Sequence, residues 1–180
     1  MATWNIDLSH SAIGFAARHM VVSKTRGRFA KFGGQIQFDP SDLSKGSVSV
    51  EIEPASVDTG DAQRDGHLRS ADFFDVEKFP KATFESIKVI DEGEGRLSIH
   101  GHLTLHGVTR PVVLEATYEG SGKDPWGGER AGFSAKTTLD RRDFGITFNK
   151  ALDQGGVLVG DKVELTLEVE AIKSAQSAAA

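Results

Sequence analysis

The sequence predicts an all-β protein in which one antiparallel sheet of about eight strands curls into a closed barrel. Apolar and polar residues alternate with a period of two along nearly the whole chain, which is typical of strands with one buried and one solvated face. Several of these segments reach about ten residues, longer than most sandwich strands, and an open sheet of this width would leave two exposed edges. A closed barrel is therefore favoured over an immunoglobulin-like sandwich.

The alternation is clearest in residues 163–171, where Val, Leu and Ala alternate with Glu and Thr. The same pattern occurs in residues 48–53 and 97–105. Further strands are expected at about 11–20, 26–38, 82–90, 108–119 and 129–139. Glycine, proline and aspartate lie between these segments and predict turns there.

One segment lacks the alternation and predicts a short helical insertion at about residues 59–75. Asp58 or Thr59 can cap a helix that runs from about Asp61 to Leu68. A charged helical segment inside a barrel sequence is expected to lie against one side or one end of the barrel.

Composition limits the classes of function. The chain has 180 residues, enough for one ordinary domain, and its net charge of -5 argues against a general nucleic-acid binder. It has no cysteine, which excludes disulfides and thiolate metal sites, and no run of about 20 apolar residues that would span a bilayer. We expect residues 1–172 to form the barrel and residues 173–180, which are small and polar, to form a disordered tail.

The chain opens with Met1-Ala2-Thr3-Trp4, which has neither a basic start nor an apolar stretch before a cleavage site. If Met1 is the native start, a cytoplasmic location is expected.

Two histidines, His100 and His102, point to the same face of a predicted strand, about 6.7 Å apart. Pairs of this kind can bind zinc, but a third ligand would have to come from a neighbouring strand. Their face lies opposite the apolar residues of the same strand, so we expect it to be solvated. No metal site is predicted here.

Catalytic motifs are weak. The chain contains no nucleophile elbow, phosphate-binding loop or dinucleotide fingerprint, and we predict no catalytic residues and no cofactor. The alternative is a lipid-acting hydrolase or isomerase, which would use Asp65 and His67 as an acid–base pair or a metal at His100 and His102.

Three basic side chains, Arg64, His67 and Arg142, belong to charged clusters in and beyond the helical insertion. Such groups beside a barrel can position a polar head group at the entrance to an apolar interior. The alternative interpretation is an Arg–Asp network that ties the insertion to the barrel wall.

Several short blocks occur in order along residues 3–172. They include Trp4-Asn5-Ile6-Asp7 with His10-Ser11, Gly27-Arg28-Phe29, Arg64-Asp65-Gly66-His67-Leu68, Phe79-Pro80, Gly101-His102-Leu103-Thr104-Leu105-His106-Gly107 and Arg142-Asp143-Phe144-Gly145. Together they resemble the YceI family of lipocalin-like, polyisoprenoid-binding proteins. The resemblance implies an extended eight-stranded antiparallel lipocalin-like barrel around a long apolar channel, with a helix laid over it.

The resemblance also implies a ligand, either an isoprenoid such as ubiquinone or a prenyl pyrophosphate, or a fatty-acid-like lipid. Many family members carry a secretion signal and work in the periplasm. The predicted function is therefore non-catalytic binding, sequestration or transport of a long-chain isoprenoid lipid. A third hypothesis is a structural homodimer that pairs two barrels through the long strands or the insertion.

Twelve residues on the inward faces of the predicted strands are expected to line the channel. They are Phe15, Ala17, Ile36, Phe38, Val48, Val50, Phe84, Ile99, Leu103, Phe133, Leu165 and Leu167. Small inward residues at Ala17, Gly101 and Ala135 lie between larger ones and are expected to leave space for the ligand. Arg64, His67 and Arg142 are the expected head-group end.

Overall fold

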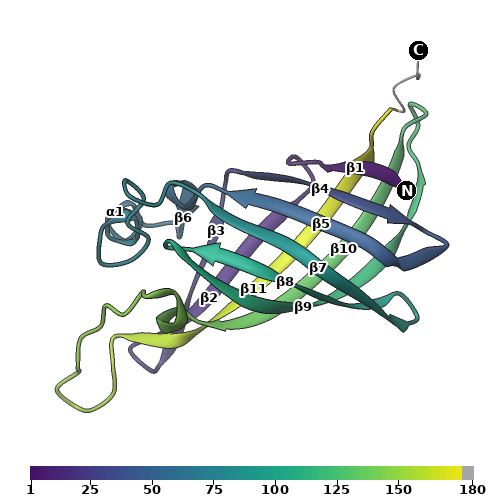
Figure 1. The fold of residues 1–180 in the computed structure, drawn as a ribbon. Helices are drawn as coiled ribbons and strands as arrows, with labels where there is room; N and C mark the ends of the chain where they lie inside the picture. The colour runs from purple at the N-terminus through teal and green to yellow at the C-terminus, as the bar shows by residue number, and fades with distance from the viewer. Residues whose placement is uncertain (176–180) are drawn as a thin grey trace.

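The computed structural model describes residues 1–175, and the chain is mostly antiparallel β-sheet with one short α-helix (Figure 1). The strands are β1 (Ala2–Ile6), β2 (Ala12–His19), β3 (Ser23–Phe29), β4 (Phe32–Asp39), β5 (Asp42–Ile52), β6 (Val57–Asp58), β7 (Ala82–Gly93), β8 (Arg96–Leu105), β9 (Val108–Lys123), β10 (Glu129–Asp140) and β11 (Val159–Lys173). The helices are α1 (Ala62–Arg69) and two 3-10 turns, η1 (Pro54–Ser56) and η2 (Arg141–Phe144). Within residues 1–175, no helix is long and apolar enough to cross a membrane.

Eight strands close the predicted barrel. The order is β1-β4-β5-β7-β8-β9-β10-β11, and β11 pairs back onto β1, with Ile6 opposite Ala171 and Trp4 opposite Lys173. This closure confirms the fold class expected from the alternating pattern, because every interior strand has a neighbour on both sides.

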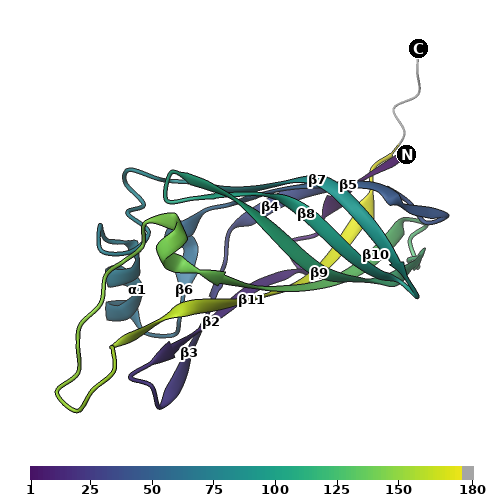
Figure 2. The ribbon, with the colours of Figure 1, turned by 60° about the horizontal axis from the view of Figure 1, so that its bottom comes forward.

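The other strands extend the barrel at one end. β2 pairs with the first part of β11, from Val159 to Glu168, and β3 and β6 follow β2 in order. β1 and β2 therefore pair with the same edge of β11, one after the other along its length, and residues 7–11 connect them. Figures 1 and 2 both place α1, the β2–β3 hairpin and the loop before β11 at this end, with the described chain termini at the opposite end.

Some predicted boundaries were wrong. The predicted strand 26–38 is broken at Ala30, whose N–H donates to the Ser56 carbonyl at 3.1 Å, so β3 and β4 are separate strands. β11 continues through Lys173, and the N–H of Ser174 donates to the Thr3 carbonyl at 2.8 Å, so sheet structure extends past residue 172. Of the predicted tail, residues 176–180 lie outside the described residues.

The helical insertion forms where the sequence predicts it, but with a different cap. The Asp61 carboxylate accepts from the Arg64 N–H at 3.0 Å, and neither Asp58 nor Thr59 fills this position. Arg69 then donates to the carbonyls of Ala55 at 2.8 Å and Val57 at 3.2 Å. These bonds hold α1 against η1 and β6, at the end of the barrel where β2 and β3 extend.

Candidate functional site

Three adjoining cavities follow one another from the α1 end into the barrel, and we refer to them together as the channel. The deep cavity, of about 130 Å³, and the middle cavity, of about 140 Å³, share Ile13, Ile52, Leu103 and Leu165 in their walls. Each is close in size to the cavity of about 150 Å³ that stays dry and binds benzene when it is lined by aliphatic and aromatic residues.

The third, outer cavity has a volume of about 410 Å³ and lies at the α1 end. It shares Phe15, Ala17, Leu68, Phe73 and Val159 with the middle cavity. The shared lining residues place the outer cavity next to the middle one and the middle one next to the deep one, so the three cavities line up from the α1 end into the barrel.

All twelve predicted wall residues line these cavities. Phe15 and Ala17 stand between the outer and middle cavities, and the other ten line the deep cavity, two of them also reaching the middle one. β-Strand alternation explains this result, because residues two apart point to the same side of a strand and a closed sheet has one interior. Contact of these residues with a ligand stays a prediction.

One expected gap is filled. Gly101 lies on the inward face of β8, but the Phe84 ring from neighbouring β7 covers it so closely that a Cβ at this position would overlap the ring. Gly101 therefore makes room for Phe84 rather than for a ligand. Ala17 and Ala135 do line cavities, as the alternation predicts.

Several lining residues have no signal in the strand pattern. Phe148 and Leu158 reach the outer cavity from the loop before β11, and Leu68 and Phe73 reach it from the insertion. The rings of Phe73 and Phe148 lie 5.2 Å apart, so the insertion and the loop meet across the outer cavity. An irregular loop has no periodicity, and nothing local in the sequence indicates which of its residues point inward.

The outer cavity is basic. Arg18, His19, Arg64 and His67 line it, and Asp61 is the one acidic side chain among the lining residues. The Asp61 carboxylate already caps α1, and its hydrogen bond from the Arg64 N–H holds its pKa below the ordinary value. The wall therefore carries excess positive charge at the open end of an apolar channel.

The positive charge of Arg64 is not neutralised by its hydrogen-bond acceptors. Its Nε donates to the Thr59 hydroxyl at 2.8 Å and its Nη2 donates to the Thr59 carbonyl at 2.9 Å, and both acceptors are neutral. His67 also lines the cavity, but its Nε2 lies 2.8 Å from an Asp72 carboxylate oxygen. Of the two head-group candidates placed here, Arg64 is thus the less neutralised.

The structure does not place Arg142 in the outer cavity. Its guanidinium donates to both carboxylate oxygens of Asp140, at 3.0 and 2.7 Å, and it lines none of the three cavities. Its neighbour Arg141 reaches the middle cavity instead, held by the carbonyls of Gly160 and Ile146, each at 2.9 Å. Burial lowers the pKa of Arg141, and these carbonyls identify it as a clamp between η2 and β11.

The alternative acid–base pair is not assembled. The Asp65 carboxylate is buried and accepts from the N–H and the hydroxyl of Thr59, at 2.9 and 2.6 Å. His67 bonds to Asp72, and no hydrogen bond in the described part of the chain joins His67 to Asp65. Asp65 is accounted for as an anchor of α1, so this arrangement does not favour the hydrolase or isomerase hypothesis.

No close group of three metal-ligand side chains includes His100 or His102; within residues 1–175 the group found lies elsewhere. His100 lies opposite Lys88 across the β7–β8 ladder, and its Nε2 is 3.2 Å from the Ser98 hydroxyl. His102 lies opposite Glu85 and is exposed. A cationic neighbour disfavours a metal ion at His100.

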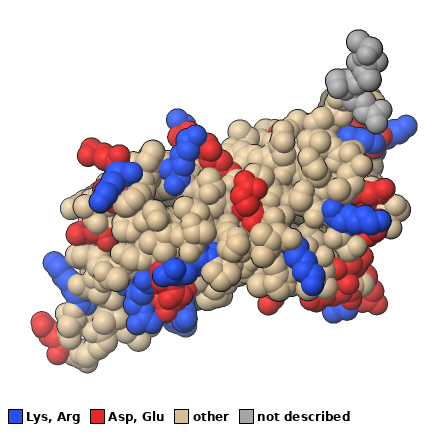
Figure 3. All heavy atoms as spheres, in the orientation of Figure 1, with Lys and Arg blue, Asp and Glu red and all other residues tan. Residues whose placement is uncertain are grey.

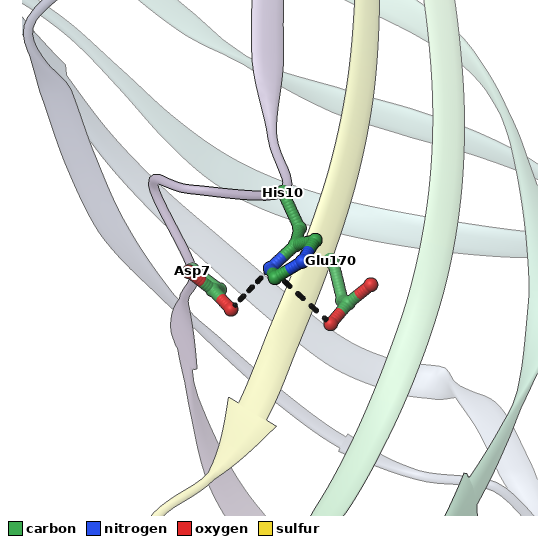
Figure 4. A group of neighbouring side chains, drawn as sticks. All are labelled: Asp7, His10 and Glu170. Carbon is green, nitrogen blue, oxygen red and sulfur yellow. Dashed lines mark hydrogen bonds and ion pairs between the residues drawn. The ribbon is translucent and has the colours of Figure 1, made fainter. Parts of the chain in front are cut away.

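A different group of metal-ligand side chains comes together at the interruption between β1 and β2. The Nδ1 of His10 lies 2.9 Å from the Asp7 carboxylate and 4.0 Å from that of Glu170 (Figure 4). Arg130 already supplies a positive charge there: its Nη1 donates to Asp7 at 2.8 Å and to Glu170, and its Nε donates to Asp124 at 3.1 Å. We interpret the group as an ion-pair network that fixes the interruption to β11 and to the β9–β10 turn.

Comparisons with known proteins agree with the geometry. A family model described as a YceI-like domain matches residues 4–171. A UPF0312 protein of Vibrio cholerae is 47% identical over 138 residues, which cover 77% of this chain and 73% of the relative. The crystal structure of Burkholderia cenocepacia BcnA has a TM-score of 0.81 at 27% identity and covers 92% of this chain and 98% of its own.

A fourth similarity concerns the fold alone. The structure of a polyisoprenoid-binding domain from Saccharophagus degradans, implicated in plant cell wall breakdown, has a TM-score of 0.71 at 16% identity. It covers 97% of this chain and 100% of its own.

Proposed function

The chain belongs to the YceI-like family, and on this premise we propose that it binds a long-chain isoprenoid amphiphile without chemistry, with the tail in the channel and the head group in the outer cavity. One observation carries the proposal: a basic outer cavity at the α1 end is followed by two apolar cavities that reach into the barrel. The polyisoprenoid-binding domain with a similar fold supports the same class of ligand.

Burial of the tail is sufficient to supply the affinity. A chain that buries about 400 Å² of apolar surface gains about 10 kcal/mol at 25 cal/mol per Å². Association and ordering of the chain remove a large part of this gain. Because apolar contacts discriminate weakly between chains of similar size, the channel selects mainly by length and by the head group at its open end.

The charge of the outer cavity favours an anionic head group. Arg18 and Arg64 line the cavity, and Arg64 has only neutral hydrogen-bond partners among the described residues. A phosphate or pyrophosphate would give these guanidinium groups charged acceptors, which roughly doubles the strength of a hydrogen bond. We therefore propose a prenyl phosphate or pyrophosphate in preference to a neutral quinone.

The experiment is extraction of purified protein with organic solvent, followed by mass spectrometry of the extract. The expected result is an isoprenoid lipid bound at a fixed ratio. Ala17→Phe tests its location, because Ala17 lies between the outer and middle cavities and a phenyl ring there narrows the connection. The matched control is Ala12→Phe on the exposed side of the same strand, β2.

Lipid lost from the Ala17→Phe protein and kept by the Ala12→Phe protein supports the proposal. Wild-type protein that is repeatedly empty, and that takes up neither a prenyl phosphate nor ubiquinone when either is added, would contradict it.

A further inference from the structure

The turn between β2 and β3 is apolar and exposed. It consists of Met20, Val21 and Val22, which we call the hairpin tip, and their exposed fractions are 45%, 59% and 84%. Hairpin turns ordinarily carry glycine, asparagine, aspartate or serine. Three consecutive exposed apolar residues in a turn are costly in water unless another apolar phase covers them.

The backbone of the hairpin tip is strained as well. Met20 has a φ of 52° and Val21 a φ of 68°, in the left-handed region that favours glycine and asparagine. A β-branched residue is rarely found there, because its Cβ substituents crowd the backbone. Both the apolar side chains and the positive φ angles are therefore unfavourable in a hairpin turn. Residues that depart from local preferences in this way cluster at functional sites.

The hairpin tip adjoins the rim of the outer cavity. The Met20 N–H donates to the Leu158 carbonyl at 2.9 Å, and Leu158 lines that cavity. Val21 packs against Gly156 of the same loop, in which Val157 is 40% exposed. The hairpin tip and Val157 thus form an apolar rim beside the opening through which the proposed ligand enters.

Basic side chains stand behind this rim. Arg18 lies opposite Lys24 across the β2–β3 ladder, and Arg26 follows two residues further along β3. One carboxylate, Glu164, lies among them, 2.9 Å from the Lys24 Nζ, and the nearby positive charges lower its pKa. Figure 3 shows Lys and Arg side chains gathered at the lower left, over the β2–β3 hairpin.

This local charge contrasts with the whole chain, whose net charge is -5. The loop beside the hairpin tip adds one cation, Lys150, and one anion, Asp153, so it does not reverse the sign. Positive charge around an apolar tip is complementary to a bilayer that contains anionic lipids, because each basic residue near such a surface adds attraction that falls off within a Debye length.

We propose that the hairpin tip inserts into the surface of an anionic lipid bilayer and holds the outer cavity against it. The amphiphile then passes between bilayer and channel without exposing its tail to water. The transfer of the amphiphile between bilayer and channel rests on the proposed function. The docking of the protein on the bilayer rests only on the hairpin tip and the basic residues around it.

Flotation with vesicles tests the docking, using phosphatidylcholine with or without phosphatidylglycerol. We expect wild-type protein to float with the anionic vesicles and to be released by high salt. The test variant combines Met20→Asn, Val21→Gly and Val22→Asn, which removes the apolar surface and supplies residues that accept positive φ. We expect its vesicle binding to fall by about tenfold or more while its thermal stability is kept or raised.

The matched control is Ile87→Asn, because Ile87 is 66% exposed on β7, away from the outer cavity. It should float like the wild type. Test-variant protein that floats like the wild type, or wild-type protein that ignores anionic vesicles, would overturn the proposal. Light scattering identifies the other occupant: a dimer that the test variant dissociates would assign the hairpin tip to a second copy of the chain.

Lipid content of the same preparations separates the two proposals. Docking with an empty channel would contradict only the proposed function. A channel filled with lipid in protein that never floats would contradict only the docking.

Discussion

The two ends of the barrel are built in different ways. At the end with the chain termini, β1, β4 and β11 close the ring by backbone hydrogen bonds, and Trp4 stacks on Phe38 with their ring centroids 4.8 Å apart. At the α1 end, aromatic rings also meet, but Phe73 and Phe148 belong to the insertion and a loop rather than to paired strands.

From this difference we expect the α1 end to open more easily than the end with the chain termini. Opening the termini end would break ladder hydrogen bonds and expose a residue such as Trp4, which is 1% exposed. Opening the α1 end would separate side chains and few backbone pairs, because elements with few buried contacts and exposed backbone have low local stability. The following changes test this contrast, from the largest expected effect to the smallest.

Trp4→Ala is expected to lower the free energy of unfolding by about 4 kcal/mol, because it removes the largest buried side chain at the closed end. Urea denaturation measures the change. Trp4→Phe is the control and should cost much less, since the buried indole N–H has no hydrogen-bond partner within residues 1–175 to lose. Equal losses in the two variants would mean that the N–H, and not the ring volume, stabilises this end.

Asp7→Asn is expected to cost about 2 kcal/mol near neutral pH, because it weakens charged hydrogen bonds that fix the interruption between β1 and β2. The Ser9 hydroxyl, with His10 and Arg130, holds the pKa of Asp7 well below its usual range. A carboxylate with a lowered pKa stabilises the fold above the unfolded-state pKa of about 3.9, and this contribution disappears as the pH falls.

The difference in stability between wild type and Asp7→Asn should therefore be constant above about pH 5 and shrink below about pH 4. Denaturation at a series of pH values measures it. Asp42→Asn is the control, since Asp42 pairs with Lys45 on the surface, where solvent screens the pair, and it should contribute much less than Asp7. A difference that grows in acid would contradict the assigned role of Asp7.

Arg64→Gln is expected to weaken binding of a prenyl phosphate by about tenfold, the value of one charged hydrogen bond, and to leave binding of a neutral quinone unchanged. Titration with a soluble short-chain analogue of each ligand measures this. Arg142→Gln is the control, because its guanidinium is bound to Asp140 outside the cavities. Equal losses for both head groups would indicate that Arg64 acts only through Thr59.

Phe148→Ala is expected to lower the stability by about 1 kcal/mol or less but to speed ligand dissociation severalfold, because the ring lies across the outer cavity on a loop. Stopped-flow displacement measures the dissociation rate. A loss of stability as large as that of Trp4→Ala would contradict the contrast between the two ends.

Much of the channel was predictable because its walls are strands. In β11, for example, Leu165 and Leu167 follow the alternation, and any closed antiparallel sheet turns such residues to its interior. The same reasoning failed for Gly101, where an adjacent strand supplies Phe84 to fill the space. A different inference, from a cluster of charged residues, failed for Arg142, which lies next to the residue that reaches the channel. In an irregular turn, two adjacent residues can point to opposite sides. The sequence of such a turn has no periodic pattern that would indicate which of the two faces the cavity.

The sequence by itself determined the all-β class, the helical insertion and the inward faces of the strands, because alternation, caps and turn residues act over a few neighbouring positions. Only the tertiary structure decided that the cavities adjoin one another, that Arg130 binds Asp7 and Glu170, and that the hairpin tip adjoins the outer cavity. These relations join residues distant in the chain, and they depend on strand register and loop path, which local preferences leave open.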